Sequence, residues 1–99
     1  MRRGSTPTNT FDVDIDLRGA TVFVTYGQGG RNIIEKTGED VVINEHTLEV
    51  HLTQEETLEF IDGAVEIQIR YVFPNGSADA SNIMRTTAER ILKDGVIEP

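Results

Sequence analysis

The chain of 99 residues contains no cysteine and no tryptophan. Without a thiol it can form no disulfide, no cysteine nucleophile and no metal site with thiolate ligands. A chain without cysteine is compatible with assembly in a reducing cytoplasm. Sugar-binding surfaces usually offer exposed tryptophan or tyrosine. Here only Tyr26 and Tyr71 are present, and both are expected to point inward.

Basic residues are also scarce. Nine lysines and arginines stand against seventeen acidic residues, which gives a net charge of -8. Apart from the adjacent pair Arg2 and Arg3, the basic residues are scattered singly. Proteins that bind nucleic acid draw much of their affinity from lysine and arginine side chains on phosphates. We therefore expect neither nucleic acid nor an anionic membrane surface as a partner.

Long apolar runs are missing as well, since none approaches the roughly 20 residues that a transmembrane helix needs. The first ten residues include no apolar segment, so we expect no secretory signal. The Met1–Asn9 segment has no periodicity and is rich in Ser, Thr and Gly, which predicts a flexible N-terminal arm. Residues 10–99 are expected to form one domain with a single modest core.

The clearest pattern present is a β-hairpin between Gly63 and Met84. Apolar residues alternate with mostly polar ones from Val65 to Phe73, the period of two that a half-buried strand requires. Pro74–Ser77 then supplies a reversal, and its Asn-Gly pair predicts a type I′ turn. The return strand is expected from about Ala78 to Thr86.

Five more strands are expected earlier in the chain: Thr10–Asp16, Thr21–Tyr26, Asn32–Lys36, Val41–Asn44 and Thr47–Leu52. Thr53 and Glu56 have the spacing of a capping box, which predicts one short helical turn over Thr53–Phe60. Ala88–Lys93 could form a second turn. Short strands with turns every eight to twelve residues predict an all-β fold, an antiparallel immunoglobulin-like β-sandwich of about 6–8 strands. The expected core consists of Phe11, Val13, Val22, Val24, Leu48, Val50, Leu52, Val65, Ile67 and Ile69.

Asp12, Asp14 and Asp16 form the most tempting chemical constellation. Spaced two apart on a strand, they would project from one face, and carboxylate oxygens suit Ca²⁺. An EF-hand loop would need glycine and glutamate where this chain has Leu17 and Phe23, so that motif fails. Like charges along a strand also prevent edge-to-edge pairing. We therefore expect a solvated edge and no metal site.

The other candidate sites also have structural interpretations. Gly27–Gly30 lacks the ending of a phosphate-binding loop and is expected to be a turn. His46 is expected at a loop tip and His51 on an outward strand face, and nothing supplies the further ligands of a zinc site. The acidic residues near Glu56 suit the start of a helix. No catalytic or cofactor motif is present, so we expect no enzyme and no cofactor.

Several segments resemble a family of small phage and prophage structural proteins of Gram-positive hosts. These are Thr6–Phe11, Val50–Leu58, Val65–Arg70, Gly76–Asn82 and Ile91–Ile97. The layout is also similar, more weakly, to the N-terminal β-sandwich domain of phage upper baseplate proteins. The resemblance implies a virion protein, assembled in the host cytoplasm, whose partners are other virion proteins and further copies of itself. It brings no active-site residues.

Three functional hypotheses follow. The first is a non-enzymatic virion structural protein, serving in capsid decoration, the neck or a tail or baseplate connector. Here Arg2 and Arg3 of the arm would dock on the acidic Asp12, Asp14 and Asp16 strand of an adjacent copy. The alternative is a glycan- or receptor-binding module of a phage particle. The third, a Ca²⁺-dependent module or enzyme, depends on the aspartate strand alone.

Overall fold

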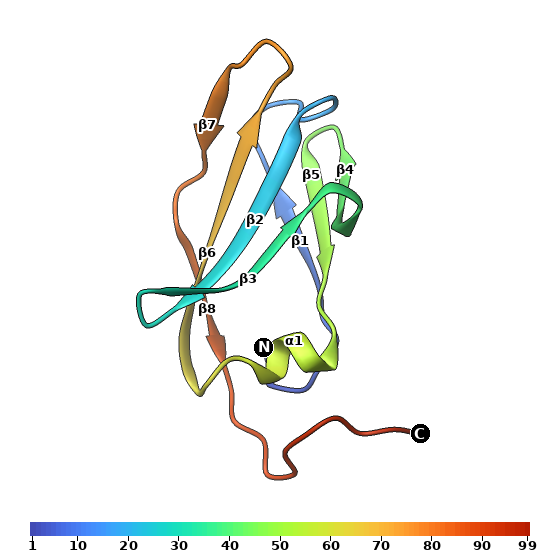
Figure 1. The fold of residues 1–99 in the computed structure, drawn as a ribbon, viewed down its shortest axis with the longest axis vertical. Coiled ribbons are helices and arrows are strands. Elements are labelled where there is room, and N and C mark those ends of the chain that lie inside the picture. Colours follow the sequence, from blue (N-terminus) through green and yellow to red (C-terminus); the bar gives the residue numbers. More distant parts are fainter.

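The computed structural model describes all residues from 1 to 99. It contains eight strands, one short α-helix and one 3-10 turn (Figure 1). Their bounds are β1 Thr8–Asp12, β2 Thr21–Gln28, β3 Arg31–Thr37, η1 Gly38–Asp40, β4 Val41–Asn44, β5 Thr47–His51, α1 Gln54–Leu58, β6 Gly63–Val72, β7 Ala78–Ala80 and β8 Met84–Ala88. The α-helix has five residues, so the structure contains no helix that could span a bilayer.

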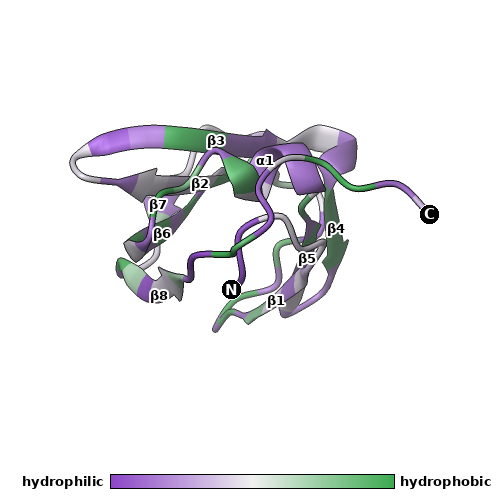
Figure 2. Cartoon of the chain, turned by 90° about the horizontal axis from the view of Figure 1, so that it is seen from below, coloured by the Kyte–Doolittle hydropathy of each residue, from purple (hydrophilic) through white to green (hydrophobic).

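The strands form two antiparallel sheets. The smaller sheet has the order β1-β5-β4, and the larger has the order β3-β2-β6-β7, with β8 also paired to β6. Seen from below, the two sheets form separate layers, with α1 at the near end (Figure 2). The orders match strands B-E-D and C′-C-F-G of the immunoglobulin sandwich. The expected fold class, an antiparallel immunoglobulin-like β-sandwich with one short helical turn, is confirmed.

The core lies between the two sheets and is built by alternation. In β2 and β6 every second side chain is buried, and the register sets Val24 opposite Ile69 and Tyr26 opposite Ile67. Eight of the ten expected core residues are buried, while Phe11 and Val13 are half-buried at its margin. Leu17 and Phe60 were not among the expected core residues, but both are fully buried although they lie outside the strands.

The N-terminal boundary differs from the expectation. β1 begins at Thr8, inside the segment expected to be an arm, because Thr8 and Asn9 pair with His51 and Val50 of β5. Further back, Arg2 forms a parallel bridge with Glu89. The Met1–Asn9 segment therefore lies against its own sandwich, because its backbone groups find partners there.

Two details of the main hairpin are also corrected. Gly76 has a φ of +88°, but Asn75 does not have a positive φ, so the expected type I′ turn is wrong. Gly76 N donates to Phe73 O and Phe73 N donates to Ser77 O, which makes a three-residue loop of the kind that ends in a left-handed glycine. Proline at the first loop position fixes a negative φ and so favours this geometry.

The return strand of this hairpin is split. Ser81 Oγ accepts a hydrogen bond from Ile69 N, and Ser81 N donates to Ile69 O, which interrupts the strand between β7 and β8. β8 then continues to Ala88, two residues beyond the expected end. Ala88–Lys93 forms no helical turn, because Ala88 pairs with Gly63 and Glu89 bridges Arg2.

The buried side of β6 gives the first testable prediction. Ile67 is almost fully buried between the sheets, so Ile67→Ala should lower the free energy of unfolding by about 2–5 kcal/mol. The matched control is Ile83→Ala, because Ile83 is 53% exposed, and we expect a change within about 0.5 kcal/mol. Urea denaturation followed by circular dichroism measures both. A near-neutral Ile67→Ala would contradict the described core.

Candidate functional site

The five residues expected to carry an interaction are not brought together in one place. Arg2 lies at the β8 end of the molecule and forms an ion pair with Glu89 at 3.4 Å. Its neighbour Arg3 points into the domain and donates to the carbonyl oxygens of Leu58, at 3.0 Å, and Phe60. The three aspartates follow a different path at the end of β1.

Arg3 is a structural residue. Its side chain is 18% exposed, against 64% for Arg2. A guanidinium suits this position because its planar fork can donate to two carbonyl groups at once, here at and just beyond the end of α1. Next to it, Gly4 has a positive φ and lies so close to Ile91 that an added Cβ would come within 3.2 Å of it. The structure thus places Arg3 inside its own domain.

The aspartates do not share one strand. β1 ends at Asp12, and the chain then turns because Val13 N donates to His46 O and Leu17 N donates to Glu45 O. This path buries Leu17 and corrects the expected strand over Thr10–Asp16. No group of three acidic or histidine side chains is arranged as a metal site. The calcium hypothesis required the three aspartates on one strand, and they do not share one.

Asp16 is paired within the loop that follows β1. Both of its carboxylate oxygens contact the Arg18 guanidinium, and one also accepts from Arg18 N at 3.0 Å. These hydrogen bonds lower the pKa of Asp16 to about 2. Arg18 also reaches Glu45 at the tip of the β4–β5 hairpin. The carboxylate of Asp16 is thus bound by Arg18 of its own loop.

The two histidines lie where the sequence indicated. His46 is exposed at the tip of the β4–β5 hairpin, and His51 is exposed on an outward position of β5. His51 Nδ1 lies 3.2 Å from Thr8 Oγ1 on the adjacent strand. Neither ring is gathered with further ligands.

The two tyrosines differ in their surroundings, since Tyr26 lies in the core and Tyr71 lines an open hollow of about 250 Å³ with Phe23 and Arg70. Tyr26 is fully buried, and its hydroxyl donates to Asn9 Oδ1 at 2.7 Å. Burial raises the pKa of Tyr26, and the charge of Glu56 raises it further. Tyr71 is half-buried and packs edge-on against Phe73, with 5.9 Å between ring centroids.

An ion pair that the sequence did not suggest joins β3 to α1. Lys36 Nζ lies 2.7 Å from Glu56 Oε2, and Glu56 also completes the capping box with Thr53, as expected. Burial opposes ionisation of Glu56, but its hydrogen bonds with Lys36 and Thr53 N outweigh that cost and lower its pKa. The capping pattern could be read from local spacing, whereas the contact with Lys36 depends on tertiary structure.

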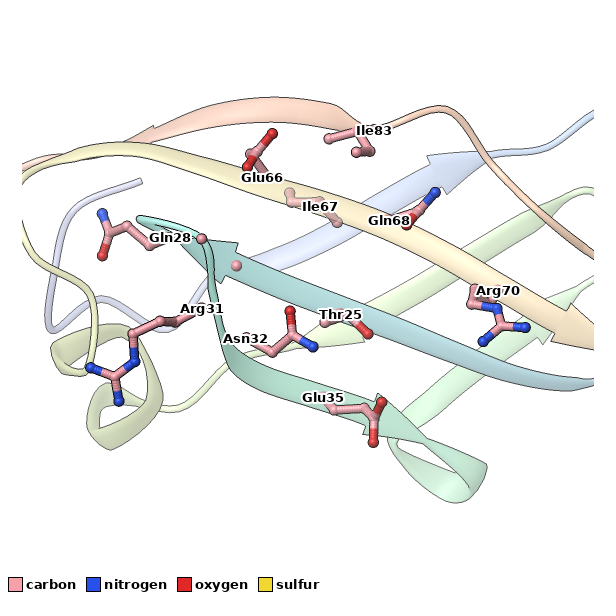
Figure 3. A pocket seen from close by; sticks show the side chains of 12 residues that line it. Thr25, Gln28, Arg31, Asn32, Glu35, Glu66, Ile67, Gln68, Arg70 and Ile83 are labelled. Atoms are coloured by element: carbon pink, nitrogen blue, oxygen red, sulfur yellow. The ribbon is translucent and has the colours of Figure 1, made fainter.

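The outer surface of the larger sheet is hollowed. Thr25, Asn32 and Gln68 line an open hollow of about 390 Å³, with Arg31, Glu35 and Arg70 around it (Figure 3). We call these six residues the large-sheet face. Arg31, Glu35 and Arg70 are exposed and none of them forms an ion pair. Alternation along β6 signals that Gln68 and Arg70 point outward.

The outer surface of the smaller sheet has a different character. Thr10 of β1 pairs with Glu49 of β5, and Glu49 pairs with Val42 of β4, so that these three exposed residues form one row. Asp12 and His51 lie on the same side of the sheet. We call Thr10, Asp12, Val42, Glu49 and His51 the small-sheet face. Neither Asp12 nor Glu49 forms an ion pair.

Arg3 and Arg2 offer a matched pair of substitutions. Arg3→Ala removes two hydrogen bonds from a charged, largely buried donor and should lower the free energy of unfolding by about 1.5–3 kcal/mol. Arg2→Ala removes an exposed ion pair with Glu89 and an exposed hydrogen bond to Arg90 O, and should change it by less than about 1 kcal/mol. Thermal or urea unfolding of the two variants measures both changes in the free energy of unfolding. Equal effects would mean that Arg3 does not hold the end of α1.

The lowered pKa of Glu56 predicts an acid-sensitive contribution to stability. Such a contribution is complete above the carboxyl's unfolded pKa, near 4.5, and is lost as the pH falls through its lower folded value. Glu56→Gln keeps the capping-box acceptor but removes the charge next to Lys36. We expect it to cost about 1 kcal/mol at pH 7 and progressively less in acid. Urea unfolding from pH 7 to pH 3 measures this.

The matched control is Glu59→Gln, since Glu59 is exposed and has no ion pair. It should stay within about 0.5 kcal/mol of the parent protein at every pH. If the difference between parent and Glu56→Gln stayed constant down to pH 3, the contact with Lys36 would not be the source of the effect.

Comparisons with known proteins add no functional assignment. No protein-family model and no curated protein sequence matches this chain. A solved structure described as the V domain of amphioxus IgVJ-C2 is similar at 13% identity, with a TM-score of 0.38, over 92% of this chain and 97% of that one. That TM-score is too low to support the fold class, which follows from the strand order of the two sheets.

Proposed function

We propose that this chain is a non-enzymatic structural protein of a phage virion, acting through protein–protein contacts in capsid decoration, the neck or a tail or baseplate connector. The observation that carries the proposal is the set of large aliphatic side chains exposed near α1 and along the C-terminal residues. Ile61 is 71% exposed and Leu92 is 91% exposed. Large apolar side chains that are exposed in this way can be covered when another protein binds.

These side chains are presented on an anchored backbone. Gln54 of α1 donates to Ile97 O at 3.0 Å and accepts from Ile97 N at 2.9 Å, which ties the C-terminal residues to the helix. The side chains of Val96 and Ile97 nevertheless stay exposed. A fixed backbone with exposed apolar side chains favours binding, because little conformational entropy is left to lose.

The ionisable groups support a role without catalysis. Perturbed pKa values gather at active sites, but they also arise in structural ion pairs. Here each shifted group has a structural cause. Asp16 and Arg18 pair with each other, Tyr26 is buried in the core, and Glu56 bonds Lys36 and caps α1. Every buried side-chain nitrogen and oxygen has a hydrogen-bond partner, so none is held ready for a substrate.

The assignment to a virion rests on the resemblance of segments such as Val50–Leu58 and Gly76–Asn82 to phage and prophage structural proteins. A particle component acts through repeated contacts with other virion proteins, and a small sandwich with exposed aliphatic side chains suits that role. On this proposal the chain is incorporated after synthesis in the host cytoplasm.

The test is to look for the chain in purified particles. Quantitative mass spectrometry of density-banded virions should find it in several copies per particle, relative to the major capsid protein. Leu92→Gln should lower that number several-fold, because it removes an exposed apolar contact. Lys93→Gln, at the adjacent exposed position, should not. Particles that lack the chain while the lysate contains it would refute the proposal.

A further inference from the structure

We propose that copies of this chain stack with the large-sheet face of one copy on the small-sheet face of the next. The setting of this contact, a repeated assembly, rests on the proposed function. The partner is a second copy of the chain. Neither Ile61 nor Leu92 belongs to either face.

The large-sheet face carries arginines without acidic partners. The protein carries a net charge of -8, and most of its arginines are neutralised by acidic neighbours. Arg31 and Arg70 are exposed without ion pairs around the hollow, with the unpaired Glu35 beside them (Figure 3). Glu66 also lines the hollow, but it forms an ion pair with Arg85. The two unpaired arginines therefore outnumber the one unpaired acid, and this face keeps a small positive charge that suits an acidic partner.

The small-sheet face is acidic. Asp12 and Glu49 are both exposed and unpaired there, and Glu39 and Asp40 lie beside them around a second hollow that also includes Val42 and Glu49. The single cation at this hollow, Lys36, is already bound to Glu56. The two outer faces of the same sandwich are thus of opposite charge, so each copy carries both halves of a complementary contact.

Each face also exposes one large apolar side chain. Val42, on the edge strand β4 of the small-sheet face, is 57% exposed, and Ile83, at the hollow of the large-sheet face, is 53% exposed. Protein interfaces combine apolar contacts with polar ones. Stacking would cover both apolar side chains in addition to joining the charged residues, and the charged residues would set the orientation.

This contact is heterologous, because the surface used by one copy differs from the surface used by the next. The two faces lie on opposite sides of the sandwich, so a pair of copies always leaves one face of each kind free. Such contacts continue until a ring closes or a filament grows. A face-to-face pair would instead set Arg31 and Arg70 of one copy against a surface with the same two arginines.

The experiment reverses the charges of each face separately. Arg31→Glu with Arg70→Glu makes the large-sheet face acidic, and Asp12→Lys with Glu49→Lys makes the small-sheet face basic. Sedimentation velocity at about 0.1 M salt, where the Debye length is roughly 10 Å, measures association. Each variant alone should associate at least about tenfold more weakly than the parent protein. An equal mixture of the two variants should recover association, since their altered faces are again complementary.

Two controls accompany it. Arg90→Glu with Lys93→Glu makes the same change in net charge as the arginine variant, at exposed residues outside both faces, and should associate as the parent does. Salt of about 1 M, with a Debye length of roughly 3 Å, should weaken the parent's association. Thermal unfolding of every variant establishes that the sandwich is intact, which is expected because all substituted residues are exposed.

Other outcomes overturn the stacking contact. If only the arginine variant lost association, the copies would pair through their large-sheet faces alone. If the parent protein stayed monomeric at its highest soluble concentration, or the mixture failed to recover association, the faces would not meet. Either result leaves the proposed function intact as long as the chain is present in purified particles, so the two failures are distinguishable.

Discussion

The antiparallel pairing of β2 with β6 is the contact on which the rest of the structure depends. Its register joins the two longest strands at the centre of the larger sheet. Because side chains alternate across a strand, one register sends Val24 and Ile69 into the core and leaves Thr25 and Gln68 outside. A shift by one residue would exchange the two sets. The core and the outer face of the larger sheet are therefore determined together.

Features determined by neighbouring residues were the ones that could be predicted. The alternation of β6 and the capping box between Thr53 and Glu56 were both read correctly, because each lies within a few positions. The N-terminal segment was not, since Arg3 bonds residues 55 and 57 positions later. The turn at Asn75 was misread because Pro74 restricts the backbone more strongly than the Asn-Gly pair favours a type I′ turn.

The sequence predicts the outer surfaces only in part, because it gives the direction of the side chains from local alternation. Alternation indicates which side chains of β6 point outward, but it does not say which charges stay unpaired. Arg85 lies beside Glu66 through the β6–β8 register, whereas Arg70 lies beside Ala80 and has no acidic neighbour there. The expected strand through the three aspartates was wrong because Val13 N and Leu17 N donate to carbonyl groups of the β4–β5 hairpin, which turns the chain after Asp12.

The placement of the first nine residues has a consequence for the order of folding. Thr8 and Asn9 pair with β5, Arg3 bonds the end of α1, and Met1 bonds Thr87 and Glu89. Every one of these partners is synthesised later than the segment itself. On a ribosome the contacts of Thr8, Asn9 and Arg3 therefore wait until β5 and α1 have emerged, and those of Met1 wait until nearly the whole chain has emerged. The loose arm that its composition suggests describes the unfinished chain, and completion of β8 converts it into part of the folded domain.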